Sequence, residues 1–393
     1  MTHLTTKILP TLETVDSTAW DNLVGSASPF LEYGFLRGLE TSGCLKPRSG
    51  WTPHIVVARD AESDADGIVG AVPLYIKDNS EGEFVFDWSW AEAAMRAGLD
   101  YYPKAVAAVP FTPVTGARIL VAPDRDDHEK IAKKLVEATL TVADELDLSS
   151  VHFNFIPQSQ RSLFEDFGLP IRWGMQYHWT NDDGTDSAGQ YRDFDHFLSR
   201  FRSKRRANIR RERRKLAESG VTTRIVTGGD VTDADLGRIF RYYLDTVQKH
   251  FYGRQYLTEE FFLTVGQTLT DRLHLVFAED DQGPFAGAFN LFKGDRLYGR
   301  YWGCEQDIPY AHFETCMYRP IQWCIDHGVR VFEPGAGGEH KFDRGFLPTP
   351  TFSAHYIRDP RLRRAVTQFV DHERHQVQRT IHHLTHEATP FKH

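Results

Sequence analysis

The order of the apolar segments constrains the fold most, because strand-like and helix-like stretches alternate along the whole chain. The second half of the chain repeats the order of the first half. In the first half two strands, a helix and a strand are expected at Gly67–Ile76, Phe84–Trp88, Asp127–Leu146 and Val151–Phe155. In the second half two strands, a helix and a strand are expected at Phe285–Phe292, Arg296–Trp302, Ala311–His327 and Val329–Phe332. This alternation predicts an α/β chain with two related halves.

Local matches between the halves point to an internal duplication. Three segments recur in the same order: 68–71 with 285–288, 151–155 with 329–333, and 167–170 with 345–348. The alternative is that any two α/β halves share such pieces. A chain of 393 residues also exceeds a single core, so two domains are expected. We place them at residues 1–190 and 221–393, with a basic connecting helix at 191–220.

Other segments complete the expected order of elements. Asp193–Ser219 is expected to form one long helix. Asp233 begins a strongly periodic helix with one apolar face. Asp359–His386 is expected to form a helical tail rich in His and Arg.

Charge and cysteine content limit the function classes. The formal net charge is −8, so the whole molecule is not a general binder of polyanions. The four cysteines form no CxxC pair and are too few to staple the chain, which favours reduced thiols in the cytoplasm. The sequence has neither the pattern of a signal peptide nor an apolar stretch of roughly 18 residues, so we expect no integral membrane contact.

The segment Glu333–Phe346 concentrates reactive residue types where a strand ends. In an open α/β sheet, ligands bind at the carboxyl ends of the strands. Glu333, Glu339 and His340 are candidates for a general base, and Lys341 and Arg344 are cations for a carboxylate, a phosphate or a developing oxyanion. The alternative is a glycine-rich loop with solvated charges.

A second cluster lies on the preceding strand and helix. Arg300 and Trp302 occupy an aromatic strand, where an arginine needs a partner. That partner is either a substrate carboxylate or one of the acids Glu314 and Glu333. His312 and Glu314 stand near the start of the next helix and face the same strand ends. Glu314 is a candidate catalytic residue, and His312 a candidate substrate contact; the alternative is that Glu314 simply suits the helix dipole.

Positions 200–215 hold ten Lys or Arg residues and one Glu. The run has three interpretations: a solvated face, contact with phosphates of RNA or of a phosphorylated carrier, or docking on anionic lipid. We favour phosphate contact, and the residues expected to make it are Lys204, Arg205, Arg206 and Arg210. The histidines of the tail lack metal-ligand spacing, so no metal site is expected.

Many short segments resemble the FemAB-like proteins, a family of tandem acyltransferases with GNAT-type folds. Besides 333–346, these segments are 86–88, 101–104, 109–116, 152–155, 176–179, 203–213, 299–303 and 312–314. The resemblance implies two GNAT-like domains, each with a mixed, mostly antiparallel sheet flanked by helices. It implies Lys341 before the pair Gly345-Phe346 as a catalytic residue. It also implies that substrate contacts include Phe346, Asp87, Trp88, Thr112 and His178.

The family implies transfer of an acyl or aminoacyl group to an amine acceptor, such as a cell-wall peptide or a small metabolite. The chemistry needs no metal and no tightly bound cofactor. The donor is aminoacyl-tRNA, which would make tRNA a partner, or an acyl-coenzyme A. The junction Cys304–Ala311 lacks the glycine-rich turn that holds the pyrophosphate of coenzyme A, which favours another carrier. The alternative function is a non-catalytic module that binds peptidoglycan peptides or RNA.

Overall fold

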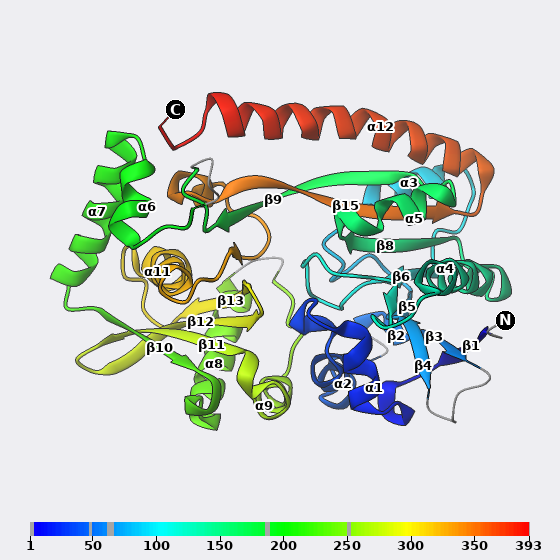
Figure 1. Ribbon diagram of the computed structural model, residues 1–393, viewed down its shortest axis with the longest axis horizontal. Coiled ribbons are helices and arrows are strands. Elements are labelled where there is room, and N and C mark those ends of the chain that lie inside the picture. The colour runs from blue at the N-terminus through cyan, green and yellow to red at the C-terminus, as the bar shows by residue number, and fades with distance from the viewer. Residues whose placement is uncertain (1–3, 47–48, 61–66, 185–188, 250–252, 393) are drawn as a thin grey trace. The chain divides into compact units, whose positions relative to one another are not determined.

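The computed structural model divides the chain into two compact units. It describes residues 4–46, 49–60, 67–184, 189–249 and 253–392. Unit 1 comprises residues 1–174 and 350–378, and unit 2 comprises residues 175–349 and 379–393. The sequence predicts domains that are continuous in the chain, whereas each unit draws on two segments. The reason is that two long strands, β9 (Ile171–Thr180) and β15 (Leu347–Ile357), each run from one unit into the other (Figure 1).

Unit 1 contains two sheets. The first has the order β1-β3-β4-β7, and all its pairs are antiparallel. The second has the order β15-β8-β6-β5-β2, in which only β6 and β8 are parallel. The strands are β1 (Leu4–Leu9), β2 (Trp51–Pro53), β3 (Ile55–Asp60), β4 (Ile68–Val72), β5 (Leu74–Lys77), β6 (Lys104–Ala107), β7 (Leu120–Val121) and β8 (Ser150–Ile156).

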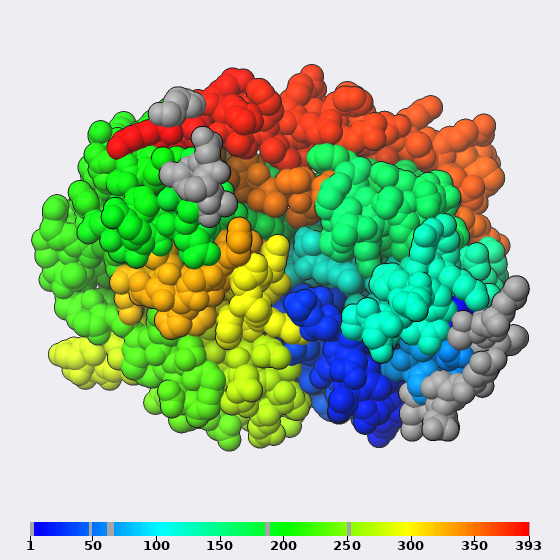
Figure 2. Space-filling view, viewed as in Figure 1, coloured from blue at the N-terminus to red at the C-terminus, as the bar shows by residue number. Residues whose placement is uncertain are grey.

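Helices bury the apolar faces of these sheets. They are α1 (Ser17–Val24), α2 (Tyr33–Thr41), α3 (Trp88–Arg96), α4 (His128–Glu145), α5 (Arg161–Asp166) and α12 (Pro360–His382). Ile131 and Leu135 of α4 lie in the same core as Val56 of β3. One face of α12 packs Val366 and Val370 beside Trp90 of α3, while its other face remains at the surface (Figure 2).

Unit 2 is built on the sheet order β10-β11-β12-β13-β14-β9. Its strands are β10 (Thr222–Thr227), β11 (Leu273–Asp280), β12 (Gly283–Lys293), β13 (Arg296–Cys304), β14 (Val331–Glu333) and the second part of β9. As in unit 1, one parallel pair, here β13 with β14, stands in an otherwise antiparallel sheet. The fold class expected from the sequence, tandem GNAT-like units with helices around mixed sheets, is confirmed.

Helices cover both faces of the unit 2 sheet. They are α6 (Phe194–Arg200), α7 (Ser203–Glu218), α8 (Asp233–Lys249), α9 (Glu259–Thr268), α10 (Ala311–Phe313), the π-helical turn η7 (Glu314–Tyr318) and α11 (Arg319–Asp326). Tyr301 of β13 packs on Tyr243 of α8 and Phe262 of α9. On the opposite face, Phe292 of β12 packs on Trp323 of α11. The described residues include no helix that is both long enough and apolar enough to cross a membrane.

Three expected elements differ from the structure. The expected strand Phe84–Trp88 is wrong, because α3 begins at Trp88 and the residues before it form bends and coil. The expected strand Gly67–Ile76 is divided at Pro73, which lacks an N–H, into β4 and β5 of different sheets. The expected helix Asp193–Ser219 is two helices, since Phe201 between them is extended and forms a β-bridge with Phe391.

Candidate active site

The glycine-rich loop of unit 2 follows the parallel pair of strands. The pairing of β13 with β14 ends at Tyr298 opposite Glu333, and the loop 334–338 leads into a short 3-10 helix, η8 (Glu339–Arg344). Gly335, Gly337 and Gly338 have φ values of 88°, 70° and 82°, a region that disfavours residues with a Cβ. The glycines therefore set the shape of the loop that joins Glu333 to Lys341.

Lys341 points its ammonium group at the backbone of this loop. Its Nζ donates a hydrogen bond to the carbonyl oxygen of Gly335 at 2.8 Å and lies 3.4 Å from those of Pro334 and Ala336. Only 7% of Lys341 is exposed, and burial lowers its pKa to about 8. Among the described residues it forms no ion pair with a carboxylate. A buried cation without a counter-ion is suited to stabilise negative charge that develops on a substrate.

Glu333 is a buried carboxyl group with one oxygen that is not hydrogen-bonded. Its Oε1 accepts a hydrogen bond from Arg296 at 2.8 Å. Its Oε2 has no hydrogen-bond donor among the described residues and lies 3.9 Å from Nε2 of His178. Burial raises the pKa of Glu333 to about 7, against the opposing effect of Arg296. A carboxyl group that titrates near neutral pH and keeps one oxygen available is a suitable general base.

His178 is influenced by both Glu333 and Lys341: its Nε2 lies 3.9 Å from Oε2 of Glu333, and the charge of Lys341 affects its pKa. Burial, together with the charges of Arg296 and Lys341, lowers its pKa to about 3, so its imidazole is neutral at physiological pH. The side chains of Glu333 and His178 lie on one face of the sheet, because their neighbours Phe332 and Trp179 lie together in the core on the other face. The structure therefore brings together Glu333 and His178, two residues that the sequence placed in the site.

A β-bulge sets the position of Arg300. Phe289 pairs with Tyr301 and the next residue, Asn290, pairs with Gly299, so Arg300 is the extra residue. Its guanidinium carbon lies 5.0 Å from the centroid of the Tyr301 ring. The two acids considered as partners from sequence are both engaged by other arginines: Glu333 by Arg296, and Glu314 by Arg213.

Two imidazoles, those of His312 and His340, pack against each other. The ring of His312 lies 5.2 Å from that of Trp302 and 5.5 Å from that of His340, measured between centroids. Burial and the nearby charges of His340, Lys341 and Arg344 lower the pKa of His312 to about 4. The pKa of His340 is also lowered, first by burial and then by Arg344 and Lys341. Both shifts favour the neutral imidazole, and the low pKa of His312 makes it a weak base.

Some residues expected in the site have structural partners instead. Arg344 stacks on Phe313 and donates to Glu212 at 2.8 Å, and Phe346 is fully buried against Phe332. Arg213 donates hydrogen bonds to both oxygens of the Glu314 carboxylate, so neither oxygen is free to act as a base. Glu339 differs from these residues, because it is exposed at the start of η8 and forms no hydrogen bond or ion pair with another described side chain.

The cations of the basic run have different surroundings. Lys204 is exposed, Arg205 pairs with Asp343 at 2.6 Å, and Arg210 pairs with Asp195 at 2.9 Å. Arg206 lies 3.5 Å from the carbonyl oxygens of Ser199 and Phe201. The three arginines thus contact groups of the protein itself.

The remaining expected site residues, Asp87, Trp88 and Thr112, belong to unit 1. Asp87 is buried and accepts hydrogen bonds from Lys104 at 2.5 Å and Tyr101 at 2.6 Å. Burial raises the pKa of Asp87, but the charges of Lys104 and His152 and the hydrogen bonds to the carboxylate together outweigh it and hold the pKa at about 2. Trp88 is 58% exposed, and the Thr112 hydroxyl donates to the carbonyl oxygen of Pro110.

Sequence reasoning missed Arg296, Glu212 and Arg213. Arg296 begins a strand directly after a turn, where an arginine looks like an ordinary surface residue. Glu212 is the lone acid in the basic run, and this was the one available signal. It is buried, and its second oxygen accepts a 2.5 Å hydrogen bond from Tyr318. Among the described residues, no group of three or more His, Cys, Asp or Glu side chains is arranged to hold a metal ion.

Comparison with known proteins places the chain in a family. Residues 11–393 match the FemAB-like family, which is described as peptidoglycan biosynthesis/recognition. The chain belongs to the FemAB-like family. No curated protein matches the chain in sequence.

Solved structures with low sequence identity share the fold of this FemAB-like chain. FemX is 10% identical with a TM-score of 0.53, and the match covers 90% of this chain and 99% of FemX. A conserved protein of unknown function from Bacteroides thetaiotaomicron is 8% identical with a TM-score of 0.52, and the match covers 90% and 100% of the two chains. L-PGS from Bacillus licheniformis is 13% identical with a TM-score of 0.49, covering 91% and 99%. At these identities the likeness to FemX and to the Bacteroides protein shows the fold alone.

Proposed function

We propose that this FemAB-like protein is an N-acyltransferase that transfers an acyl or aminoacyl group from a carrier to an amine. The observation that carries the proposal is that one loop is flanked by a carboxyl group and a cation of suitable kind. Glu333, which precedes the loop, has one carboxylate oxygen without a hydrogen bond, and Lys341, which follows it, has no carboxylate partner among the described residues. Transfer to an amine needs a base for the amine proton and a cation or hydrogen-bond donor for the oxyanion.

The chemistry assigns one step to each residue. The carboxylate of Glu333, directly or through a water, takes a proton from the attacking amine. The ammonium group of Lys341 stabilises the oxyanion while the new C–N bond forms and the bond to the carrier breaks. The imidazole of His340, whose neutral form is favoured, offers a second route for the proton. The family description supports an amine on a peptidoglycan peptide as acceptor, with a small metabolite as the other candidate.

The junction between β13 and α10 favours an acyl donor whose carrier is not coenzyme A. The junction between β13 and α10 contains Glu305 and Asp307 and no glycine, and α10 itself has only three residues. Two acids beside a short helix oppose the binding of a pyrophosphate. We therefore propose aminoacyl-tRNA as the first donor to test and acyl-coenzyme A as the second.

The decisive experiment incubates the full chain with each donor and a set of candidate amines, followed by mass analysis of the products. We expect Lys341→Met to lower kcat by about 100-fold or more and Glu333→Gln by a similar factor, with unfolding curves that remain cooperative. Glu339→Gln, an exposed change a few residues away, is the control and retains activity. Full activity in both site variants would contradict the assignment.

The pH dependence gives a second test of the same pair. Glu333 must be ionised and Lys341 protonated, so activity rises as pH increases through about 7 and falls as pH increases through about 8. The profile of kcat/KM is therefore a narrow bell with its maximum at about pH 7.5. A broad plateau from pH 6 to about 9 would contradict these roles.

A non-catalytic module is the alternative function. It would bind a peptidoglycan peptide or RNA without turnover, and the cations of α7 would then carry the affinity for RNA. Charge reversal of Arg205, Arg206 and Arg210 would weaken such binding, with a steep dependence on salt. Product formation with any donor excludes this alternative.

A further inference from the structure

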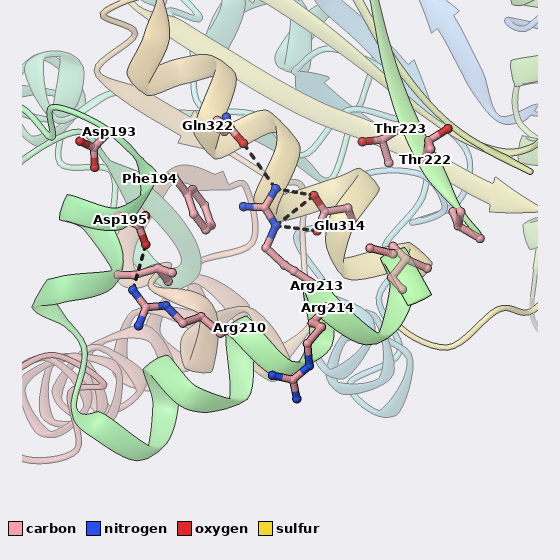
Figure 3. Close-up of a pocket in the computed structure, with 14 residues that line it drawn as sticks. Asp193, Phe194, Asp195, Arg210, Arg213, Arg214, Thr222, Thr223, Glu314 and Gln322 are labelled. Carbon is pink, nitrogen blue, oxygen red and sulfur yellow. Dashed lines mark hydrogen bonds and ion pairs between the residues drawn. The ribbon is translucent and has the colours of Figure 1, made fainter. Parts of the chain in front are cut away.

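A polar pocket of about 630 Å³ lies in unit 2, outside the candidate active site (Figure 3). Its walls come from α6, α7, the start of β10, and the helical segment formed by η7 and α11. The volume is in the range of pockets that hold small organic ligands. We infer that this pocket is a binding site for a phosphate monoester of nucleotide size.

Three arginines on α7 line the pocket: Arg210, Arg213 and Arg214. Arg213 is the best fixed of the three, because its Nε and Nη2 bind both oxygens of Glu314 and its guanidinium stacks on Phe194 at 4.5 Å. Nη1 of Arg213 has no partner in the described part of the chain, and Figure 3 shows it without a dashed line. One donor of a rigidly held guanidinium is thus available to a ligand.

The acids of the pocket are already occupied. Asp193 accepts from the backbone N–H of His196, Asp195 pairs with Arg210, and Glu314 pairs with Arg213. The hydroxyls of Thr222 and Thr223 have no protein partner within the described residues, so each can donate to a ligand. A site with donors to spare and satisfied carboxylates favours an oxyanion over a cation or a zwitterion.

The pairs at the rim are weak enough for a ligand to replace. Side-chain exposure is 56% for Arg210 and 80% for Asp195, and it is 66% for Arg214, which lies 3.5 Å from Glu218. Exposed ion pairs of this kind contribute about 0–1 kcal/mol. A phosphate dianion that meets both guanidinium groups therefore loses little by displacing the two carboxylates.

The apolar part of the lining accounts for the organic part of the ligand. The apolar residues that line the pocket are Phe194, Leu198, Leu216, Ala217 and Val221. Apolar side chains and donors in one pocket fit a ligand with a flat or apolar body and a phosphate at one end. Free inorganic phosphate would use the donors and leave the apolar side chains uncovered.

The pocket is joined to the active site through two neighbouring residues of α7. Glu212 binds Arg344 of η8, whereas Arg213 binds Glu314 on the pocket side. The two sites therefore share α7 as a wall while using different side chains. The proposal does not depend on the proposed transfer reaction, and its test uses binding alone.

The test measures binding of AMP to the full chain by calorimetry at low salt and pH 7.5. We expect saturable binding of AMP, binding of adenosine that is at least about 10-fold weaker, and binding of inorganic phosphate that is also weaker. The paired change Arg210→Gln with Arg214→Gln weakens AMP binding by about 10-fold or more.

The control changes two cations on another face of the same helix. Arg211→Gln with Lys215→Gln removes the same charge from exposed residues that do not line the pocket, and it should change AMP affinity by less than about 2-fold. Equal losses in the two paired variants would overturn the proposal, because attraction to the helix would then be non-specific. Absence of saturation by about 5 mM AMP would also overturn it.

A 5′-phosphorylated trinucleotide RNA distinguishes two sources of the same group. Tighter binding than AMP identifies the phosphorylated end of a nucleic acid as the ligand. Weaker binding identifies a free nucleotide. Both outcomes keep the phosphate monoester site, provided that the pocket variant loses affinity and the control variant does not.

Discussion

The stability of the variant Glu333→Gln, measured relative to the wild type, should increase as pH rises. The carboxyl group is 3% exposed, and burial raises its pKa from 4.5 to about 7. Below pH 4.5 it holds its proton in both the folded and the unfolded chain and has no effect on the pH dependence. Between pH 4.5 and about 7 the unfolded chain releases the proton while the folded chain keeps it, so stability is lost.

The magnitude follows from the two pKa values. A difference of one pKa unit corresponds to about 1.4 kcal/mol, so the change from 4.5 to about 7 costs the wild type about 3 kcal/mol once pH exceeds 7. Glutamine cannot ionise and retains an oxygen that accepts from Arg296. The stability of Glu333→Gln relative to the wild type should therefore increase by about 3 kcal/mol from pH 4.5 to 8.

Urea unfolding of both proteins at several pH values between 4.5 and 8 measures this quantity, and Glu339→Gln serves as the exposed control. The expected result is a relative stability that rises for Glu333→Gln and stays flat for Glu339→Gln. A flat or falling curve for Glu333→Gln would refute the reasoning, because the carboxyl group would then be solvated or fully compensated in the folded chain.

Three further changes test the packing and the buried charges by urea unfolding. Gly303→Ala should lower the free energy of unfolding by more than about 3 kcal/mol, since the added Cβ would overlap the carbonyl oxygen of Tyr242. The control Gly229→Ala has open space around the added Cβ and should change the free energy of unfolding by less than about 0.5 kcal/mol. Similar values for the two variants would contradict the packing. Lys104→Met should cost about 3–5 kcal/mol because the buried Glu83 and Asp87 lose their cation, and a loss below 1 kcal/mol would show that these acids are protonated or hydrated. Glu212→Ala should cost a similar amount, about 3–5 kcal/mol, by leaving Arg344 without its carboxylate, and an unchanged midpoint would argue against that pair.

Elements with a clear apolar period could be predicted from the sequence. The helix expected from Asp233 is α8, and it buries Leu236, Ile239 and Tyr243 as the period requires. The break at Phe201 could not be predicted in this way, because Phe201 itself still follows the apolar spacing of Phe194 and Phe197. In the structure Phe201 is extended and forms a β-bridge with Phe391 from the far end of the sequence.

The position of the candidate site could be proposed from the sequence, but the interactions among its residues could not. Its position at a strand end follows from local sequence, and so do the types of Glu333 and Lys341. Which carboxylate stays available depends on arginines contributed by distant segments: Arg213 of α7 occupies Glu314, while Arg296 of β13 binds one oxygen of Glu333 and leaves the other. Such pairings depend on tertiary contacts that neither spacing nor composition encodes.

The strands β9 and β15, each shared by the two units, restrict how such a chain can be rearranged in evolution. A gene segment that ends near residue 190 would encode β8 without residues 352–357 that pair with it, and α3 without the residues of α12 that cover Trp90. Neither unit is therefore a cassette that recombination can move into another protein. We therefore expect the two units to be exchanged as one piece, and substitutions in either to remain compatible with strands that also serve the other.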